Sequence, residues 1–567
     1  MRLPAALRLP LGCAALTLAI GLLLYLFGPP GVDRAAHVYH TAQFEQHGWR
    51  VWNNYWYAGR YELLNYSILF YPLAAVAGIG TVVLAGLAAG SALFAALVQS
   101  VTERGRLWPA LAFAVSWPAI LLAGQYPFML GAAFAMGAVL ALIRHRALTA
   151  LALVALTALT SPLAFLLLTV VLAGLASGGG PELFRRPRAR FALAGLFVLV
   201  LGEVLVLRLF PVEGRFAFYL GDLGWLMLFV VVGAIVARSV PMLRGLFVAY
   251  GVAAVLVFVF PSGVGGNFER LADYWATALL LLAYAVRPQP MRRSAVVVLV
   301  VAVVAQAVPI VRTLDGGLQE RADSASFWSG AVTFLQAHAD PNHRVEVVST
   351  WGHWESYHLA QSDIPLTRGW FRQDDFPINL PLYDGALDPE VYHRWLSSLA
   401  VGYIVLPRDE LDYSSRKEAE MLALGHRALP WLKFVHRDPN VDIYQVMDPT
   451  PMLTLAQATG PTATAYDTPS VIRFDATSLA LWLPRAGVYD LRVRYTPFWK
   501  VSDPTGVCVA PSGNGMTRLT ANRGGPVTLA FDLTLARSTS QALGTPAPVC
   551  AAPPPNAVRP GVTTGVG

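Results

Sequence analysis

Apolar segments long enough to cross a bilayer follow one another through the N-terminal half of this chain. A membrane-spanning helix needs about 20 predominantly apolar residues. Segments of that kind occur at about 11–28, 68–98, 107–124, 127–143, 191–210, 224–237, 244–260, 272–286 and 294–311. The chain as a whole is 55% hydrophobic and 14% charged, which is too apolar for a soluble enzyme. We therefore predict an α-helical polytopic membrane protein.

One further apolar stretch, residues 147–178, is either one overlong helix or two short ones. Thr160-Ser161-Pro162 interrupts it, and proline ends helices. Counting two passes keeps every later arginine cluster on the side of Arg2 and Arg8, as the positive-inside rule requires. These clusters are Arg104/Arg106, Arg144/Arg146, Arg185–Arg190, Arg238/Arg244 and Arg287–Arg293. The prediction is a hairpin, about 11 spans, a cytoplasmic N-terminus and an external C-terminal region after Arg312.

The net charge of +7 comes almost wholly from arginine, since Lys417, Lys433 and Lys500 are the only lysines. Such usage suggests a GC-rich bacterial genome. The arginines cluster between apolar segments, which is typical of cytoplasmic loops. We therefore predict a multi-pass protein of the cell membrane, with membrane lipid and no nucleic acid among its partners.

The C-terminal region changes to a soluble pattern. Residues 312–450 combine helix-like and strand-like segments, which predicts an external α/β domain. Residues 451–537 alternate apolar and polar side chains between turns, as in a small β-sandwich, and 538–567 are rich in Ala, Pro and Thr, which predicts a disordered tail. Residues 1–311 form the transmembrane domain. Cys508 and Cys550 are able to form a disulfide on the external side, a pairing the sequence leaves open.

The longest loop between spans, residues 28–71, is predicted to be external and begins with a carboxylate, Asp33, directly after the first span. A helix starting there places His37 one turn on, and a carboxylate at the mouth of a bundle suits a general base. Trp52 and Tyr57 belong to an aromatic group suited to stacking on sugar rings. The alternatives are a solvated Asp33 and an aromatic belt at the membrane surface. A metal site of Asp33, His37 and His40 is conceivable but is not favoured, and no cofactor is predicted.

The order of residues in this loop resembles that of bacterial membrane proteins of the PTPS-related and YfhO-like type, which are similar to the GT-C glycosyltransferase superfamily. The matching positions are Asp33, His37, Trp52, Tyr57, Gly59, Tyr71 and Pro72, together with the break at Ser161-Pro162, the 266–271 loop and the external C-terminal domains. The resemblance implies transfer of a sugar from a polyprenyl-phosphate donor, with Asp33 at the catalytic position. No Asp-x-Asp or Glu-Asp pair occurs in this loop, so metal-independent transfer is the expected form.

A lipid-phosphate leaving group requires cations near the headgroup plane. Arg34, Arg60, Arg215 and Arg270 all fall in loops predicted to be external. We favour Arg270 with Arg34 for the donor phosphate, because Asn267 and Arg270 at helical spacing share one face. The alternative for Arg270 is an arginine that only extends to the surface at a helix end.

Two segments of the α/β domain, around Trp351 and Trp370, are dense in tryptophan, arginine and acids. That mixture suits sugar binding and equally suits a domain packed onto a membrane bundle. Glu203 lies within an apolar span with Arg208 about one turn on, which makes it a candidate ion pair or proton relay. No Ser-His-Asp order, P-loop or nucleotide fingerprint is present.

The sequence thus favours a membrane glycosyltransferase. It would move a sugar from a polyprenyl-phosphate donor to a glycan, lipid or protein acceptor of the cell envelope. The alternatives are a transporter or flippase for an envelope precursor and a non-catalytic envelope-assembly protein. Halves of the chain show no repeat of the kind usual in transporters.

Overall fold

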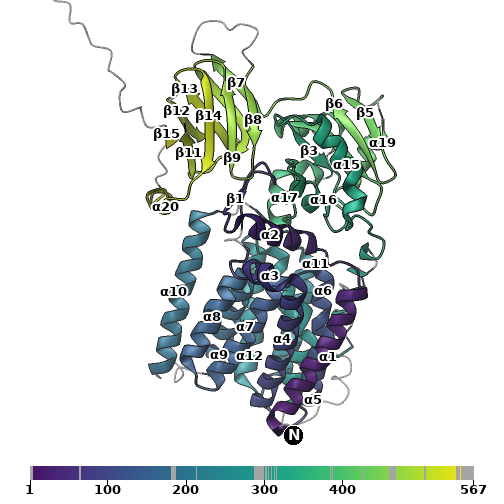
Figure 1. Ribbon diagram of the computed structural model, residues 1–567. Coiled ribbons are helices and arrows are strands. Elements are labelled where there is room, and N and C mark those ends of the chain that lie inside the picture. Colours follow the sequence, from purple (N-terminus) through teal and green to yellow (C-terminus); the bar gives the residue numbers. More distant parts are fainter. Residues whose placement is uncertain are drawn as a thin grey trace, which may run out of the picture.

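The computed structural model has a helical bundle with two sheet-containing lobes at one end (Figure 1). It describes residues 4–544 and 549–550, apart from 63–65, 180–186, 212–213, 287–298, 301–302, 304–305, 308–309, 312, 315, 384, 386, 426, 459–467 and 503–505. The N-terminal end of the chain lies at the far end of the bundle from the lobes.

The helices of the bundle and of the connections on its lobe side are α1 (Ala5–Phe27), α2 (Arg34–His47), α3 (Phe70–Ala77), α4 (Ile79–Val101), α5 (Leu107–Ser116), η1 (Trp117–Ala119), α6 (Ile120–Ala123), α7 (Tyr126–Ile143), α8 (Ala147–Thr160), α9 (Pro162–Gly179), α10 (Pro187–Leu209), α11 (Leu220–Val236), α12 (Pro241–Val259), η3 (Gly265–Glu269) and α13 (Arg270–Ala285). Five of these, α1, α4, α7, α9 and α12, are long and apolar enough to cross a membrane, and shorter apolar helices cover 107–123, 147–160 and 220–236. The chain is a membrane protein with several apolar helices. The predicted span 294–311 falls largely outside the described residues, so the count of eleven stays a prediction.

The predicted break at Ser161-Pro162 separates α8 from α9. Proline suits the first turn of α9, where its missing N–H would lack a partner in any case. The C-terminal part of α9 packs closely on the start of α12: a Cβ added at Gly178 would lie 2.2 Å from the carbonyl oxygen of Pro241. The start of α9 lies at the other end, near the N–H of Ile68, which donates to Leu159. Helices α8 and α9 therefore cross the bundle in opposite directions, as the hairpin prediction requires.

The long connections between helices meet at the lobe end of the bundle. The N–H of Phe216 donates to Ser262 across 3.0 Å, which joins the connection before α11 to the one before α13. Gly214 packs against Gln373 of the α/β lobe. The described arginines Arg104, Arg144 and Arg238 follow α4, α7 and α11 at the opposite end of the bundle. The long connections and these arginines therefore lie at opposite ends of the bundle, and the orientation across the membrane stays a prediction.

The α/β lobe contains a four-stranded sheet in the order β3-β4-β6-β5. Strands β3 and β4 are parallel and the other neighbours are antiparallel. Its elements are α15 (Ala325–His338), β3 (Arg344–Val347), α16 (Glu355–His358), η4 (Ala360–Ser362), α17 (Arg372–Ile378), η5 (Leu380–Leu382), α18 (Pro389–Ser398), β4 (Val401–Pro407), α19 (Arg416–Ala423), β5 (Leu432–Arg437) and β6 (Val441–Val446).

The second lobe is a β-sandwich of a five-stranded sheet, β15-β12-β13-β10-β7, and a four-stranded sheet, β11-β14-β9-β8. Its elements are β7 (Leu453–Ala458), β8 (Ser470–Phe474), β9 (Ser478–Leu483), β10 (Gly487–Arg494), β11 (Trp499–Ser502), β12 (Val507–Pro511), β13 (Met516–Ala521), β14 (Gly525–Phe531), α20 (Leu535–Ala542) and β15 (Val549–Cys550). Strand β10 alternates buried and half-exposed residues along its whole length, as its sequence pattern predicts.

Of the predicted tail at 538–567, residues 538–542 and 549–550 lie in regular elements, and 545–548 and 551–567 lie outside the described residues. Helix α20 continues to Ala542, and β15 pairs with β12 so that Cys550 lies opposite Cys508. Cys508 is disulfide-bonded. The pairing of β15 with β12 joins segments that are distant in the sequence, which composition alone does not reveal.

Candidate functional site

Asp33 lies at the lobe end of the bundle, immediately before α2. It occupies the N-cap position, yet its side chain makes no capping hydrogen bond. Its backbone is held instead: the N–H of Asp33 donates to Ala123 over 3.2 Å. Close approach to this segment requires glycine at position 31, where a Cβ would lie 2.3 Å from the carbonyl oxygen of Leu121. An aspartate at an N-cap normally stabilises its own helix, but here the backbone is anchored and the carboxylate is not used as a cap.

Charged side chains from both parts of the molecule face this carboxylate. Desolvation raises the pKa of Asp33 above its ordinary value, although the residue keeps some exposure to solvent. Arg270 of the bundle, followed by Arg372 and His353 of the α/β lobe, and the nearby Trp370 indole oppose that rise. A carboxylate with a raised pKa beside cations is able to take a proton from a hydroxyl group near neutral pH.

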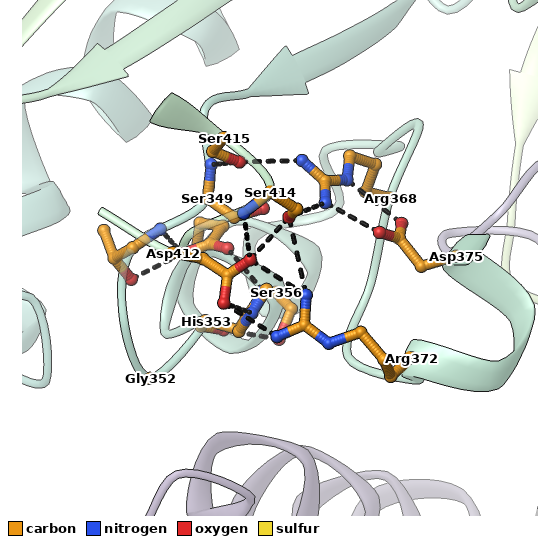
Figure 2. Close-up of polar contacts among 12 residues, drawn as sticks. Ser349, Gly352, His353, Ser356, Arg368, Arg372, Asp375, Asp412, Ser414 and Ser415 are labelled. Atoms are coloured by element: carbon orange, nitrogen blue, oxygen red, sulfur yellow. Dashed lines mark hydrogen bonds and ion pairs between the residues drawn. The ribbon is translucent and has the colours of Figure 1, made fainter. Parts of the chain in front are cut away.

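His353 is held in a buried network of ion pairs (Figure 2). Its Nδ1 lies 3.3 Å from Glu355 and its Nε2 lies 3.6 Å from Asp412. Burial disfavours the charged ring, but the two carboxylates outweigh it and raise the pKa of His353. Its backbone has a φ of 54°, an uncommon conformation for histidine that surrounding contacts must maintain.

Arg372 is fixed by the same aspartate. Its two terminal nitrogens donate to the two oxygens of Asp412 at 2.8 and 2.7 Å. The guanidinium also lies 4.9 Å from the centre of the Trp370 ring, and that ring stacks on His353 with centroids 3.8 Å apart. The network therefore holds a cation and an aromatic ring in fixed positions above the bundle.

A second buried pair anchors this corner of the lobe. Arg368 donates to both oxygens of Asp375, at 3.0 and 2.7 Å, and also donates to Ser414 and Ser415. Ser414 in turn donates to Asp412 (Figure 2). The loop that carries Trp370 is thus tied to the start of α17 and to the segment before α19.

Arg270 is the first residue of α13 and, as predicted, contacts Asn267. It donates to the amide oxygen of Asn267 over 2.6 Å. The guanidinium lies 5.2 Å from the centre of the Phe128 ring. Both contacts leave the Nε–H of Arg270 without an acceptor among the described residues.

Below Arg270, an apolar cavity of about 170 Å³ runs through the bundle. Phe128, Ala164 and Leu271 line its end nearest the lobes, and Val101, Ile143 and Leu243 line its far end. Its other walls come from α4, α7, α9, α12 and α13. A cavity with hydrocarbon walls throughout suits an acyl or isoprenoid chain.

His37 and His40 of the first loop are buried beneath the site. The Nδ1 atom of His37 lies 3.2 Å from the Tyr71 hydroxyl, and desolvation lowers the pKa of His37 to about 3. The Nδ1 atom of His40 lies 3.5 Å from a carboxylate oxygen of Glu62. His37 is therefore a neutral ring within an aromatic core, and an acceptor contact through it remains only a sequence-based prediction.

The aromatic residues of the first loop join the lobes to the bundle. β1 (Trp52–Asn53) and β2 (Arg60–Tyr61) form a small hairpin, and the Trp52 ring is buried among core residues of the β-sandwich, 5.7 Å from Trp499. The Tyr57 hydroxyl accepts a hydrogen bond from the N–H of Phe371 and is fully buried. Neither ring presents a free face, so packing between domains replaces the predicted sugar stacking.

Three other candidates make contacts with other groups. Arg34 places its guanidinium 5.2 Å from the centre of the Tyr25 ring. Trp351 packs its ring against Gly316. Glu203 lies on α10, which stands at the edge of the bundle (Figure 1), and Arg208 donates to the carbonyl of Ala542.

Within the described residues, no group of three or more His, Cys, Asp and Glu side chains is arranged to hold a metal ion. Sequence reasoning selected the segments around His353 and Arg372 but did not assign either residue to the site. Phe128 is apolar, so no chemical feature of the sequence marked it as a site residue. Its only sequence cue was the gap between the predicted spans 107–124 and 127–143, and Gly124 at the edge of that gap lies beside the backbone of Asp33.

No protein-family model matches this chain, and no curated protein matches it. Among solved structures, the chain is similar to the archaeal oligosaccharyltransferase AglB from Archaeoglobus fulgidus, determined in complex with an inhibitory peptide and a dolichol-phosphate. The match has 13% sequence identity and a TM-score of 0.35, and covers 70% of this chain and 69% of that one. So distant a likeness carries no weight for function, which rests on the site itself.

Proposed function

We propose that this chain is a membrane glycosyltransferase of the GT-C type, acting at the external face on a polyprenyl-phosphate sugar. The observation that carries the proposal is the alignment of three elements along one path: Asp33, the guanidinium of Arg270 and the apolar cavity that begins at Phe128. A lipid-linked donor has three parts in the matching order: a sugar for Asp33, a phosphate for Arg270 and a long hydrocarbon for the cavity.

In this proposal each residue has a chemical task. The hydrocarbon lies in the cavity, and Arg270, oriented by Asn267, binds the phosphate and stabilises its charge as it leaves. Asp33 accepts the proton of the acceptor hydroxyl as that oxygen attacks the anomeric carbon. Attack opposite the phosphate inverts the configuration of the sugar. Trp370 and Arg372 close the site from the α/β lobe.

The rival functions have less support. A transporter was suggested by an intramembrane carboxylate, but Glu203 lies on peripheral α10, and functional charges usually face the interior of a bundle. The disulfide at Cys508 favours an oxidising, extracytoplasmic location for the lobes.

The test is mass spectrometry of envelope glycans from a deletion strain complemented with wild type, Asp33→Asn or Asp532→Asn. Asp532 is a half-exposed partner of Lys500 in the β-sandwich, and such pairs contribute little. We expect a glycan that depends on the wild-type chain, is restored by Asp532→Asn and is missing with Asp33→Asn at equal protein level. Restoration of the glycan by Asp33→Asn would contradict the assignment of Asp33 as the catalytic base and favour a non-catalytic assembly role.

A further inference from the structure

Helix α20 packs on its own domain with its polar side and turns its apolar side outward. Arg537 reaches back from the helix and donates to the carbonyl of Phe498. Leu535 and Leu543 are 86% and 70% exposed. Residues spaced four apart share a helix face, so Leu535, Thr539 and Leu543 form one outward stripe. A helix on a water-facing domain has the opposite arrangement.

The position of α20 is fixed against the end of a membrane helix. Arg208, in the last turn of α10, donates to the carbonyl of Ala542 at the C-terminal end of α20. Beside it, Phe210 stacks on Phe498 of the β-sandwich with ring centroids 5.6 Å apart. Figure 1 shows α20 directly above the end of α10. The depth of α20 is therefore set by α10.

The surface of α10 next to this contact is apolar and exposed. Val204, Leu205 and Leu207 are 56%, 48% and 51% exposed, and within a bilayer these side chains face lipid. Because Arg208 bonds to Ala542, the outward stripe of α20 lies next to this surface on its lobe side. An interfacial amphipathic helix has the same features: an apolar stripe at the headgroup level and a polar face with an arginine.

We propose that α20 is an interfacial helix that inserts Leu535 and Leu543 into the boundary between headgroups and acyl chains, and so holds the β-sandwich down on the bilayer. The occupant of its apolar face is the lipid that surrounds α10. Such helices bury their apolar side about 5–10 Å below the headgroups. The inference does not depend on the reaction at Asp33, since neither leucine contacts that site.

Spin labelling of the full-length chain in liposomes tests the depth of α20. Cys13 is buried and Cys508 is disulfide-bonded, so a cysteine introduced at Leu535 or Leu543 takes the nitroxide. The label's accessibility to oxygen, which partitions into lipid, is compared with its accessibility to a nickel chelate, which stays in water. Gln541→Cys, on the other side of α20, and Leu424→Cys, 56% exposed beyond α19, are the controls.

We expect an oxygen-to-nickel ratio several-fold higher at Leu535→Cys and Leu543→Cys than at either control. The difference should be lost in nanodiscs whose lipid area is too small to extend past α10. Equal nickel accessibility at all four positions in liposomes would overturn the proposal. If Leu535→Cys fails to fold, Thr539→Cys reports the same stripe at an exposed polar position. Water-like accessibility there would overturn the proposal equally.

Discussion

The guanidinium of Arg270 lies 5.2 Å from the centre of the Phe128 ring, so a cation rests on the first side chain of a hydrocarbon-lined cavity. A cation over an aromatic face is attracted by the ring and needs no carboxylate to hold it there. Arg270 forms no direct ion pair among the described residues, although the carboxyls of Asp33 and Asp273 lie within the range of its charge, and its guanidinium remains available to an anion. This arrangement matches the junction between the phosphate and the hydrocarbon of a lipid-linked donor.

Replacing Asp33 with asparagine should abolish transfer without destabilising the protein. Desolvation raises the pKa of Asp33 in the folded state above its unfolded value of 3.8. The folded state therefore holds a proton that the unfolded state has released, and ionisation of Asp33 lowers stability as pH rises through that window. We expect an apparent melting temperature at pH 7 equal to or above that of wild type. A clear decrease would indicate a structural role for Asp33.

Arg270→Gln should lower activity and shift its pH dependence. Loss of one positioned donor at a developing anion typically costs roughly 10²-fold in rate. Because the positive charge of Arg270 lowers the pKa of Asp33, its removal raises that pKa, and the acidic limb of the rate profile moves to higher pH. Arg416→Gln removes the same charge from an exposed pair with Glu410 and should leave the profile in place. An unshifted acidic limb in Arg270→Gln would show that Arg270 does not act on the titration of Asp33.

Glu320→Gln should stabilise the α/β lobe increasingly as pH rises above about 4.5. Burial raises the pKa of Glu320 to about 8 from 4.5, while one of its oxygens accepts a 2.6 Å hydrogen bond from Gly352. The folded state keeps the proton, so stability falls as pH rises from 4.5 through 8. Glutamine keeps an acceptor and never ionises. Thermal unfolding at pH 5 and pH 9 should show the larger gain at the higher pH, and exposed Glu390→Gln should show none.

Trp52→Ala should act on stability rather than on substrate binding. Removal of a fully packed tryptophan typically costs about 3–5 kcal/mol, and Trp52 contacts Trp499 and Phe531 within the sandwich core. Trp49, in the same loop, is 55% exposed, so Trp49→Ala serves as the control. A raised KM with an unchanged melting temperature would restore the sugar-stacking interpretation of Trp52.

Much of the architecture is determined by local sequence. The length of each apolar segment, the proline after Ser161 and the distribution of arginines act over a few residues or a single bilayer thickness, so they predict helices, a hairpin and an orientation without any tertiary information. Alternation along residues 487–494 predicts strand β10 in the same way. The position of Asp33 directly after the first span marked it from the sequence as well.

Tertiary structure decided which side chains meet. Residues 33, 270, 353 and 372 are far apart in the chain, and only the docking of the α/β lobe on the bundle brings their charges together. Trp52 and Tyr57 are residue types common in sugar sites, but both are buried between domains. Burial of large rings lowers the free energy more than leaving them in water. The sequence alone identified the carboxylate of Asp33 and the apolar segments that cross the membrane. The fold supplied the cations that face the carboxylate and the cavity beneath them, since long-range contacts depend on packing that no local pattern encodes.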